Sequence, residues 1–388
     1  MNQAKPFLVF GRPVIEEPEI QEVIDCLRSG WLGTGPRVAQ FEADFANYKG
    51  VPASHASAVN SCTAALHVSM LAAGLEPGSE VITSPLTFCA TVNAIIHAGL
   101  VPVLADVDPQ TQCIDPHAIE AAITPRTSAI LPVHFAGYPC DMTRIMRIAE
   151  RHGLVVIEDC AHAIETEWRG QKAGTFGDFG CFSFYATKNL VTGEGGMIIG
   201  SDAQRVARTR TLALHGMSKD AWHRFGDEGY KHYEVVESGF KYNMMDLQAS
   251  LGIHQLRRVE DNFKERESIW ATYQQELKKV PLVLPSEIEK QNRHGHHLFT
   301  ILIDENDTGI TRDGFINAMN KSGVGTGVHY RSIAEHRYYQ ERFGWSPNSW
   351  PVSTRIGRKT VSLPLTAGLT SQEVSRVIES VIQALPAI

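Results

Sequence analysis

Residues 80–104 read EVITSPLTFCATVNAIIHAGLVPVL and contain two short β-like runs separated by one helix-like run. The runs EVITS and VPVL are short and mostly apolar, as buried strands are. The segment FCATVNAIIHAG between them ends at Gly99, where a helix is expected to stop. The stretch therefore predicts one β-α-β unit, in which the two strands lie parallel in the same sheet.

The same alternation extends on both sides, from about residue 55 to 200. HASAV precedes CTAALHVSMLAAG, VPVLADV precedes DPHAIEAAI, and AILPVH precedes DMTRIMRIAERHG and the strand-like LVVIED. Asp115 and Pro116 suit a helix start, while Gly74 and Gly153 fall where helices should end. Repetition at this spacing predicts an α/β fold with a mostly parallel central sheet and helices on both faces.

Two further segments bound this region. EEPEIQEVIDCLRSG, at 16–30, places Ile20 and Leu27 with Val23 and Ile24 on one helical face, and we expect this helix to pack on the large domain. From residue 246 to about 279 a helical pattern continues for longer than one compact layer requires. We place the domain junction within it, which gives a large domain of residues 1–260 and a small α+β domain of residues 261–388.

The C-terminal part has its own signals. HLFTILID predicts a strand, TRDGFINAMNKSG predicts a helix, and Thr370 with Glu373 forms a capping-box pattern at the start of the last helix. Residues 281–297 are interpreted as a polar, mobile connection.

Composition excludes several classes of partner. The chain has 388 residues, 43% hydrophobic and 20% charged, with a formal net charge of −7. This charge offers no basic surface for nucleic acid and no polybasic segment for a membrane. No signal peptide and no apolar run of membrane-spanning length are present, so we expect a cytoplasmic protein. Seven widely spaced cysteines with no CxxC pair indicate reduced, packed thiols.

One lysine stands in unusual surroundings. Residues 182–196 read FSFYATKNLVTGEGG, so Lys188 lies between an apolar run and a glycine cluster. Burial lowers the pKa of a lysine and leaves a neutral amine that can form a Schiff base with an aldehyde. The cofactor that most often uses this chemistry is pyridoxal 5′-phosphate (PLP), which also requires a phosphate site, an acid at its ring nitrogen and a flat partner for the ring.

Candidates for the phosphate and for the acid follow predicted strands. NSCTAAL, at 60–66, opens a helix whose free N–H groups suit an anion, although Ser61 and Thr63 are also ordinary N-capping residues. Ser183 is the second phosphate candidate. Asp159 ends the strand LVVIED, at the edge where open α/β sheets bind ligands, and its alternative role is a helix cap.

Two aromatic candidates complete the set. His162 is placed to bond the ring hydroxyl or to stack, and Phe88 to cover the ring face; taken alone, His162 is more often a structural residue and Phe88 a core residue. Because all these groups are predicted at the C-terminal ends of strands, their joint occurrence favours a PLP site.

The chain resembles the DegT/StrS family of PLP-dependent sugar aminotransferases, which have the aspartate aminotransferase fold. The likeness covers nearly the whole sequence and rests on blocks in family order: SGWLGTGPRVAQFE, NSCTAALH, EVITSPLTF, ITPRTSAILPVH, VIEDCAHA, FSFYATKNLVTGEGG, GFKYNMMDLQASLG and GVGTGVHYR. Within the family it is most similar to enzymes acting at C4 of nucleotide-linked 4-keto sugars, notably that of the UDP-4-amino-4-deoxy-L-arabinose pathway, which places it in polysaccharide or lipopolysaccharide biosynthesis.

The resemblance implies roles for individual residues. Lys188 matches the Schiff-base lysine, Asp159 the partner of the ring nitrogen, and Asn243 a phosphate contact supplied by the second subunit of a homodimer with shared active sites. The other implied cofactor contacts are Cys62, Thr63, Phe88, His162 and Ser183, and the implied substrate-side positions are Tyr185, Lys241, His329 and Tyr330. Cys160 and the segment HGHHLF depart from the common family pattern, which leaves some sugar contacts open.

The resemblance also implies the reaction. Glutamate donates the amino group, and the acceptor is the C4 keto group of a UDP- or dTDP-linked sugar. The alternatives are a family aminotransferase acting on a cyclitol ketone or an aminoshikimate-type ring, and a non-catalytic PLP-binding regulator. Relatives that act as dehydratases carry histidine at the lysine position, whereas residue 188 here is lysine.

Two remaining signals are weaker. His294, His296 and His297 suggest a metal site, but carboxylate or cysteine ligands at suitable spacing are missing, so no metal is predicted. The aromatic insertion at 220–236, DAWHRFGDEGYKHYEVV, is either a flap near the substrate or a surface loop.

Overall fold

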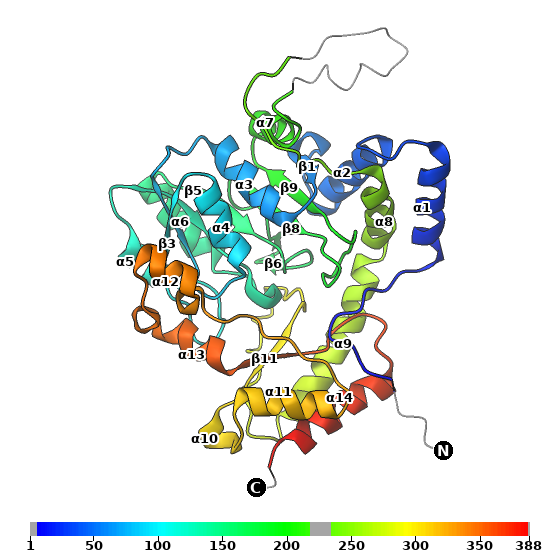
Figure 1. Ribbon diagram of the computed structural model, residues 1–388, viewed down its shortest axis with the longest axis vertical. Coiled ribbons are helices and arrows are strands. Elements are labelled where there is room, and N and C mark those ends of the chain that lie inside the picture. The colour runs from blue at the N-terminus through cyan, green and yellow to red at the C-terminus, as the bar shows by residue number, and fades with distance from the viewer. Residues whose placement is uncertain (1–5, 218–233, 387–388) are drawn as a thin grey trace.

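The computed structural model describes residues 6–217 and 234–386. Within them, seven strands form one sheet in the order β1-β9-β8-β5-β4-β2-β3 (Figure 1). Neighbouring strands from β8 to β3 are parallel, and β9 is antiparallel to both β8 and β1. The sheet is therefore mostly parallel, which confirms the predicted α/β fold.

The strands of this sheet are β1 (Ala56–Val59), β2 (Glu80–Thr83), β3 (Val101–Leu104), β4 (Thr127–Leu131), β5 (Val155–Asp159), β8 (Phe179–Ser183) and β9 (Gly196–Gly200). The helices of this region are α1 (Glu17–Ser29), α2 (Pro36–Lys49), α3 (Cys62–Ala73), α4 (Cys89–His97), α5 (Pro116–Ala122), α6 (Met142–His152), α7 (Ala203–Ala213) and α8 (Asp246–Arg257). A separate hairpin comprises β6 (Glu167–Trp168) and β7 (Gln171–Lys172).

The surroundings of β4 explain why the strands of the central sheet are mostly apolar. Ala129 and Leu131 belong to one hydrophobic cluster with α3, whereas Ile130 between them belongs to another with α6. Successive side chains of a strand point to opposite faces, so helices must cover both faces of the sheet.

The predicted helix boundaries are found in the structure. Asp115 caps α5 by accepting the backbone N–H of His117 at 2.9 Å, with Pro116 in the first turn. Helices α3 and α6 end at Gly74 and Gly153, whose φ angles of 73° and 65° favour glycine.

Helix α1 does not bury the face that its amphipathic pattern predicts. It lies against α8 and ends at Gly30 as expected, but its fully buried residues are Glu19 and Cys26. Ile20 and Leu27, on the predicted apolar face, are 44% and 53% exposed. Glu19 is buried because it pairs with Arg258 and accepts from Gln255.

Most of the C-terminal part surrounds a separate hydrophobic core below the large sheet, whereas Tyr339 and Ile356 pack in clusters with residues of that sheet (Figure 1). The elements of the C-terminal part are α9 (Val259–Leu277), β10 (Phe299–Leu302), α10 (Glu305–Thr308), α11 (Arg312–Lys321), α12 (Arg337–Phe343), α13 (Pro351–Lys359), β11 (Thr360–Leu363) and α14 (Ser371–Ala384). Helix α14 starts with the predicted capping box of Thr370 and Glu373. Leu8, from the N-terminal end, packs in this core and pairs with Val324.

The expected boundary at residues 260 and 261 falls in the first turn of α9, and it stays a prediction. The prediction of a polar, mobile connection at 281–297 is wrong at its C-terminal end. His294, His296 and His297 are buried, and the first two contact the ring of Trp270. Among the described residues, no helix combines the length and apolarity needed to cross a bilayer.

Candidate active site

A cavity of about 550 Å³ lies at the edge of the sheet where the parallel strands end. Its wall draws on the segments that follow β1, β2, β5 and β8, together with the C-terminal segment around residue 330. The cavity brings together ten of the twelve predicted site residues: Cys62, Thr63, Phe88, Asp159, His162, Ser183, Tyr185, Lys188, His329 and Tyr330.

Lys188 is held by a turn directly after β8. Its backbone N–H donates to the carbonyl of Tyr185 at 2.9 Å, and Tyr185 also pairs with Gly193 on the returning segment. Burial lowers the pKa of the Lys188 amine to about 8. A substantial fraction of the amine is therefore neutral and nucleophilic near pH 8.

Asp159, the last residue of β5, has the opposite charge and lies on the same cavity. Its Oδ1 accepts the backbone N–H of Ala161 at 3.1 Å, and its Oδ2 accepts the hydroxyl of Thr91 at 2.8 Å. Burial raises the pKa of this carboxyl, while the two donors oppose the rise. The carboxylate is thus fixed in orientation, with acceptor capacity left for a further donor.

The start of α3 borders the cavity at the predicted phosphate position. The Ser61 hydroxyl accepts the N–H of Ala64 at 3.1 Å, so the N-capping interpretation is correct for Ser61. Cys62 and Thr63 occupy the first turn, where backbone N–H groups lack helical acceptors. A Cβ at Gly196 would lie 2.6 Å from the Ser61 carbonyl carbon, so β9 approaches this turn closely only because residue 196 is glycine.

The opposite wall is aromatic. Phe88 is 56% exposed and faces Tyr330, with ring centroids 5.8 Å apart, so Phe88 is a cavity residue and not a core residue. His162 Nδ1 accepts the N–H of Ala136, which leaves its Nε2–H to donate to the Tyr330 hydroxyl at 3.1 Å. Burial lowers the pKa of His162 well below its usual range, so the ring is neutral.

His297 also lines the cavity, and the sequence interpretation missed it. Asn189 Nδ2 donates to Glu165 and to the carbonyl of Gly295, so its Oδ1 is the atom that faces His297 Nδ1, at 3.0 Å. Arg266 completes the network through a buried ion pair with Glu165. One signal in the sequence could have pointed to this network, because Asn189, which contacts His297, directly follows the predicted active lysine.

Comparison with known proteins agrees with this geometry. Residues 13–382 match the model of the DegT/DnrJ/EryC1/StrS aminotransferase family. The chain belongs to this family. The aminotransferase is 48% identical over 376 residues to the spore coat polysaccharide biosynthesis protein SpsC of Bacillus subtilis, covering 97% of this chain and 96% of SpsC.

Solved structures show the same relationship. The putative sugar aminotransferase Spr1654 from Streptococcus pneumoniae, in its PLP form, is 29% identical, with a TM-score of 0.89 and coverage of 97% and 98% of the two chains. Helicobacter pylori PseC, an aminotransferase involved in the biosynthesis of pseudoaminic acid, is 26% identical, with a TM-score of 0.91 and coverage of 98% and 100%. The present chain is thus a PLP-dependent sugar aminotransferase.

The residues of the aminotransferase fit PLP on chemical grounds. The cavity combines an amine of lowered pKa at Lys188, a buried acid at Asp159 and, at Cys62 and Thr63, first-turn amides that have no acceptor within the helix. These are the three groups that an aldehyde, a ring nitrogen and a phosphate require.

Two predicted site residues lie outside this cavity. Lys241 is exposed, and its carbonyl accepts from Asn60. Asn243 donates through Nδ2 to the Thr34 hydroxyl at 2.6 Å, while its buried Oδ1 has no partner among the described residues. Within one chain, neither is placed with Lys188. Most of the aromatic insertion predicted as a flap or a surface loop lies outside the described residues.

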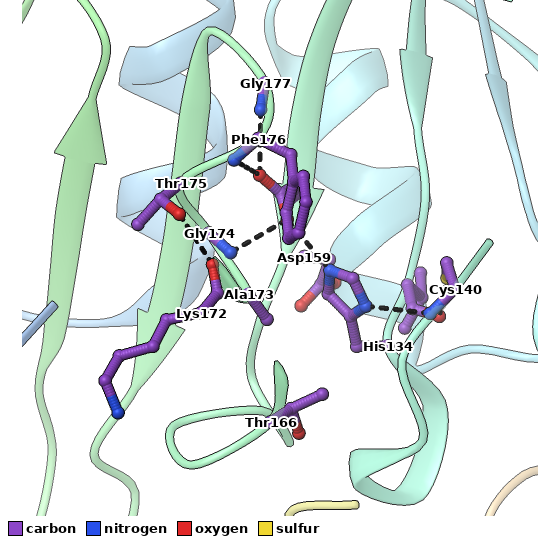
Figure 2. Close-up of polar contacts among 12 residues, drawn as sticks. His134, Cys140, Asp159, Thr166, Lys172, Ala173, Gly174, Thr175, Phe176 and Gly177 are labelled. Atoms are coloured by element: carbon purple, nitrogen blue, oxygen red, sulfur yellow. Dashed lines mark hydrogen bonds and ion pairs between the residues drawn. The ribbon is translucent and has the colours of Figure 1, made fainter. Parts of the chain in front are cut away.

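A second buried polar cluster surrounds Glu158, the residue before Asp159, and Figure 2 shows its polar contacts. The Glu158 carboxylate accepts from His134 at 3.0 Å and from the amides of Gly174, Phe176 and Gly177. His134, Glu158 and Cys160 form the one group of His, Cys, Asp or Glu side chains among the described residues whose ligand atoms lie close enough together to hold a metal ion. Both nitrogens of His134 and both oxygens of Glu158 already take part in hydrogen bonds, because His134 Nδ1 also accepts the N–H of Cys140, and the cluster anchors the loop at 173–177.

Proposed function

We propose that this aminotransferase transfers an amino group from glutamate to the C4 keto group of a UDP- or dTDP-linked 4-keto sugar. The observation that carries the proposal is the single cavity that holds the Lys188 amine, the Asp159 carboxylate and a wall of neutral histidine and tyrosine groups. A sugar offers hydroxyl groups to such a wall, and neutral imidazole and phenol groups both accept and donate hydrogen bonds.

Within this proposal the cofactor residues have separate tasks. Bound PLP supplies an electron sink that stabilises negative charge at the carbon carrying the amino group. Lys188 Nζ holds the cofactor and then moves a proton as general base and acid. Asp159 accepts the ring N–H, Phe88 covers the ring, and His162 lies near the ring hydroxyl.

The remaining predicted contacts belong to the phosphate and the substrate. Cys62, Thr63 and Ser183 bind the phosphate through the start of α3 and the end of β8. Tyr185, His329 and Tyr330 line the substrate side of the cavity. Burial lowers the pKa of His329 to about 4, so this group meets the sugar as a neutral imidazole at pH 7.

A homodimer with shared sites is part of the proposal. Asn243 would reach the phosphate of the partner's site, and Lys241 the partner's substrate. Exposed apolar side chains support a contact surface: Trp31, Leu32 and Met245 belong to the segments around Thr34 and Asn243, and Ile20 and Leu27 lie on α1. The expected cytoplasmic location also stays a prediction.

The test is a pair of half-reactions followed by absorbance. PLP-loaded protein is first mixed with glutamate alone, and the aminated enzyme is then offered UDP-4-keto and dTDP-4-keto sugars beside scyllo-inosose. We expect glutamate to convert the cofactor and a nucleotide-linked keto sugar to reverse the conversion. Turnover of scyllo-inosose alone would support the cyclitol alternative and contradict the proposal.

A further inference from the structure

A chain of two hydroxyl groups ends on the Asp159 carboxylate. Thr91 Oγ1 lies 2.8 Å from Asp159 Oδ2, and Thr87 Oγ1 lies 2.7 Å from Thr91 Oγ1. The exposed fractions of Thr87, Thr91 and Asp159 are 2%, 1% and 4%. Bulk water therefore has little access to replace either hydroxyl if it is removed.

The direction of the hydrogen bonds follows from proton counting. An ionised carboxylate only accepts, so the single hydroxyl proton of Thr91 must point at Asp159. The Thr91 oxygen then accepts, and the proton of Thr87 must point at Thr91. Aligned hydroxyls polarise one another in a low-dielectric interior, so the outer Thr87 strengthens the inner bond.

The same short segment builds another part of the site. Phe88 is the N-cap residue of α4, and Thr91 is the third residue of that helix. Thr87 and Thr91 are four residues apart and flank Phe88 in the sequence, and all three line the cavity. The start of α4 thus fixes the aromatic wall and the donor to Asp159 together.

We propose that Thr91, supported by Thr87, is a positioning residue that keeps the Asp159 carboxylate ionised and oriented to accept the N–H of the PLP ring. The inference rests on the PLP cofactor and is independent of which sugar the enzyme uses. A neutral carboxyl would lose its attraction for a protonated ring nitrogen.

The electrostatic surroundings support this role. Burial raises the pKa of Asp159, and the hydrogen bonds from Ala161 and Thr91 are the two largest opposing effects. Lys188 and His134 lower it less. The other titratable groups that interact with Asp159 across the packed elements are Cys62, Cys160, Cys181 and Tyr330. Loss of the Thr91 hydroxyl therefore moves the pKa of Asp159 upward.

The experiment is a titration of apoprotein with PLP across pH. Thr91→Val keeps the shape of the side chain and removes the donor, Thr91→Ser keeps the donor, and Thr87→Val removes only the outer hydroxyl. Thr83→Val is the matched control, because Thr83 is a buried hydroxyl of β2 that donates to the carbonyl of Leu131 and lies off the cavity.

We expect Thr91→Val to weaken PLP binding on the order of tenfold at neutral pH, as loss of a hydrogen bond to a charged group does. Binding should also begin to fail at a higher pH than in the wild type, because Asp159 takes up its proton earlier as the pH falls. Thr91→Ser should retain the wild-type profile, Thr87→Val should show a smaller shift in the same direction, and Thr83→Val should show none.

Two results would overturn the proposal. One is a wild-type PLP affinity and pH profile in folded Thr91→Val. The other is an equal loss in Thr91→Ser and Thr91→Val, because serine keeps the donor and the loss would then not follow the hydrogen bond to Asp159. If Thr91→Val does not fold, an unshifted profile in Thr87→Val decides against the hydroxyl chain.

Discussion

The side-chain oxygen of Asn189 lies 3.0 Å from Nδ1 of His297, and this contact fixes for His297 the tautomer opposite to that of His162, the second cavity histidine. Since Asn189 Oδ1 only accepts, His297 must carry its proton on Nδ1. His162 must carry its proton on Nε2, because its Nδ1 accepts the N–H of Ala136. Nε2 of His297 is thus an acceptor, whereas Nε2 of His162 carries a proton and is a donor.

These tautomers predict a spectroscopic result. Burial lowers the pKa of both rings, so both are neutral at pH 7. We expect long-range ¹H–¹⁵N NMR of histidine-labelled protein, assigned with His162→Gln and His297→Gln, to show the Nε2–H form for His162 and the Nδ1–H form for His297. The same tautomer in both rings would contradict the hydrogen-bond network described here.

Lys188→Ala should remove covalent cofactor attachment. We expect borohydride reduction of PLP-loaded wild-type protein to add the cofactor mass to the peptide that contains Lys188, and to add none to that peptide in the variant. Because the amine also moves a proton, turnover should fall by at least about 10²- to 10⁴-fold. Attachment to a different lysine in the wild type would contradict the site.

The lowered pKa of Lys188 predicts how apoprotein captures PLP. Burial disfavours the ammonium form, and the pKa is about 8, so the reactive neutral amine increases as the pH rises through this value. We expect the rate of covalent capture to rise by about tenfold per pH unit below 8 and to level off above it. Stopped-flow absorbance between pH 6 and 10 measures this, and a midpoint near 10.5 would show that Lys188 is solvated as in a free chain.

The buried ion pair of Arg266 and Glu165 should be essential for stability. Their side chains are 2% and 0% exposed, so Arg266→Met leaves a buried carboxylate without its charge partner. We expect the free energy of unfolding to decrease by about 3–5 kcal/mol, measured by denaturant titration of apoprotein. Lys264→Ala, on the same helix but in an exposed pair with Asp261, is the control and should leave it unchanged.

Shared active sites predict complementation between two inactive variants. In a mixed dimer of Lys188→Ala and Asn243→Ala chains, one site combines an intact Lys188 with an intact Asn243 from the partner. Random re-association should therefore restore about a quarter of wild-type activity, because half of the dimers are mixed and each has one complete site of two. Sedimentation should give twice the chain mass, and a lack of recovery in demonstrably mixed dimers would argue that each site is complete within one chain.

Most of the fold was predictable because local rules and the tertiary structure agree. The strands around β4 are mostly apolar since helices cover both faces, and the caps at Asp115, Gly74 and Thr370 depend only on neighbouring residues. Parallel strands also end at one edge, so Asp159 and Lys188 could be assigned to one site before any contact was known.

Other features depended on contacts between distant segments. The chain pattern at 294–297 is polar, yet these histidines are buried because Trp270, Phe263 and Asn189 surround them. The sequence of α1 is amphipathic, yet Glu19 is one of its buried residues, because Arg258 neutralises the charge of the Glu19 carboxylate.

The sequence by itself determined the fold class, which follows from periodicity, and its blocks in family order indicated the family; it also predicts Lys188 as the reactive lysine from residues close to it in the chain. Only the tertiary structure decided which hydroxyl faces Asp159, which nitrogen of His297 is free, and that Asn243 lies apart from Lys188 within one chain. The physical reason is that burial and hydrogen-bond partners are set by packing between segments that are far apart in the sequence.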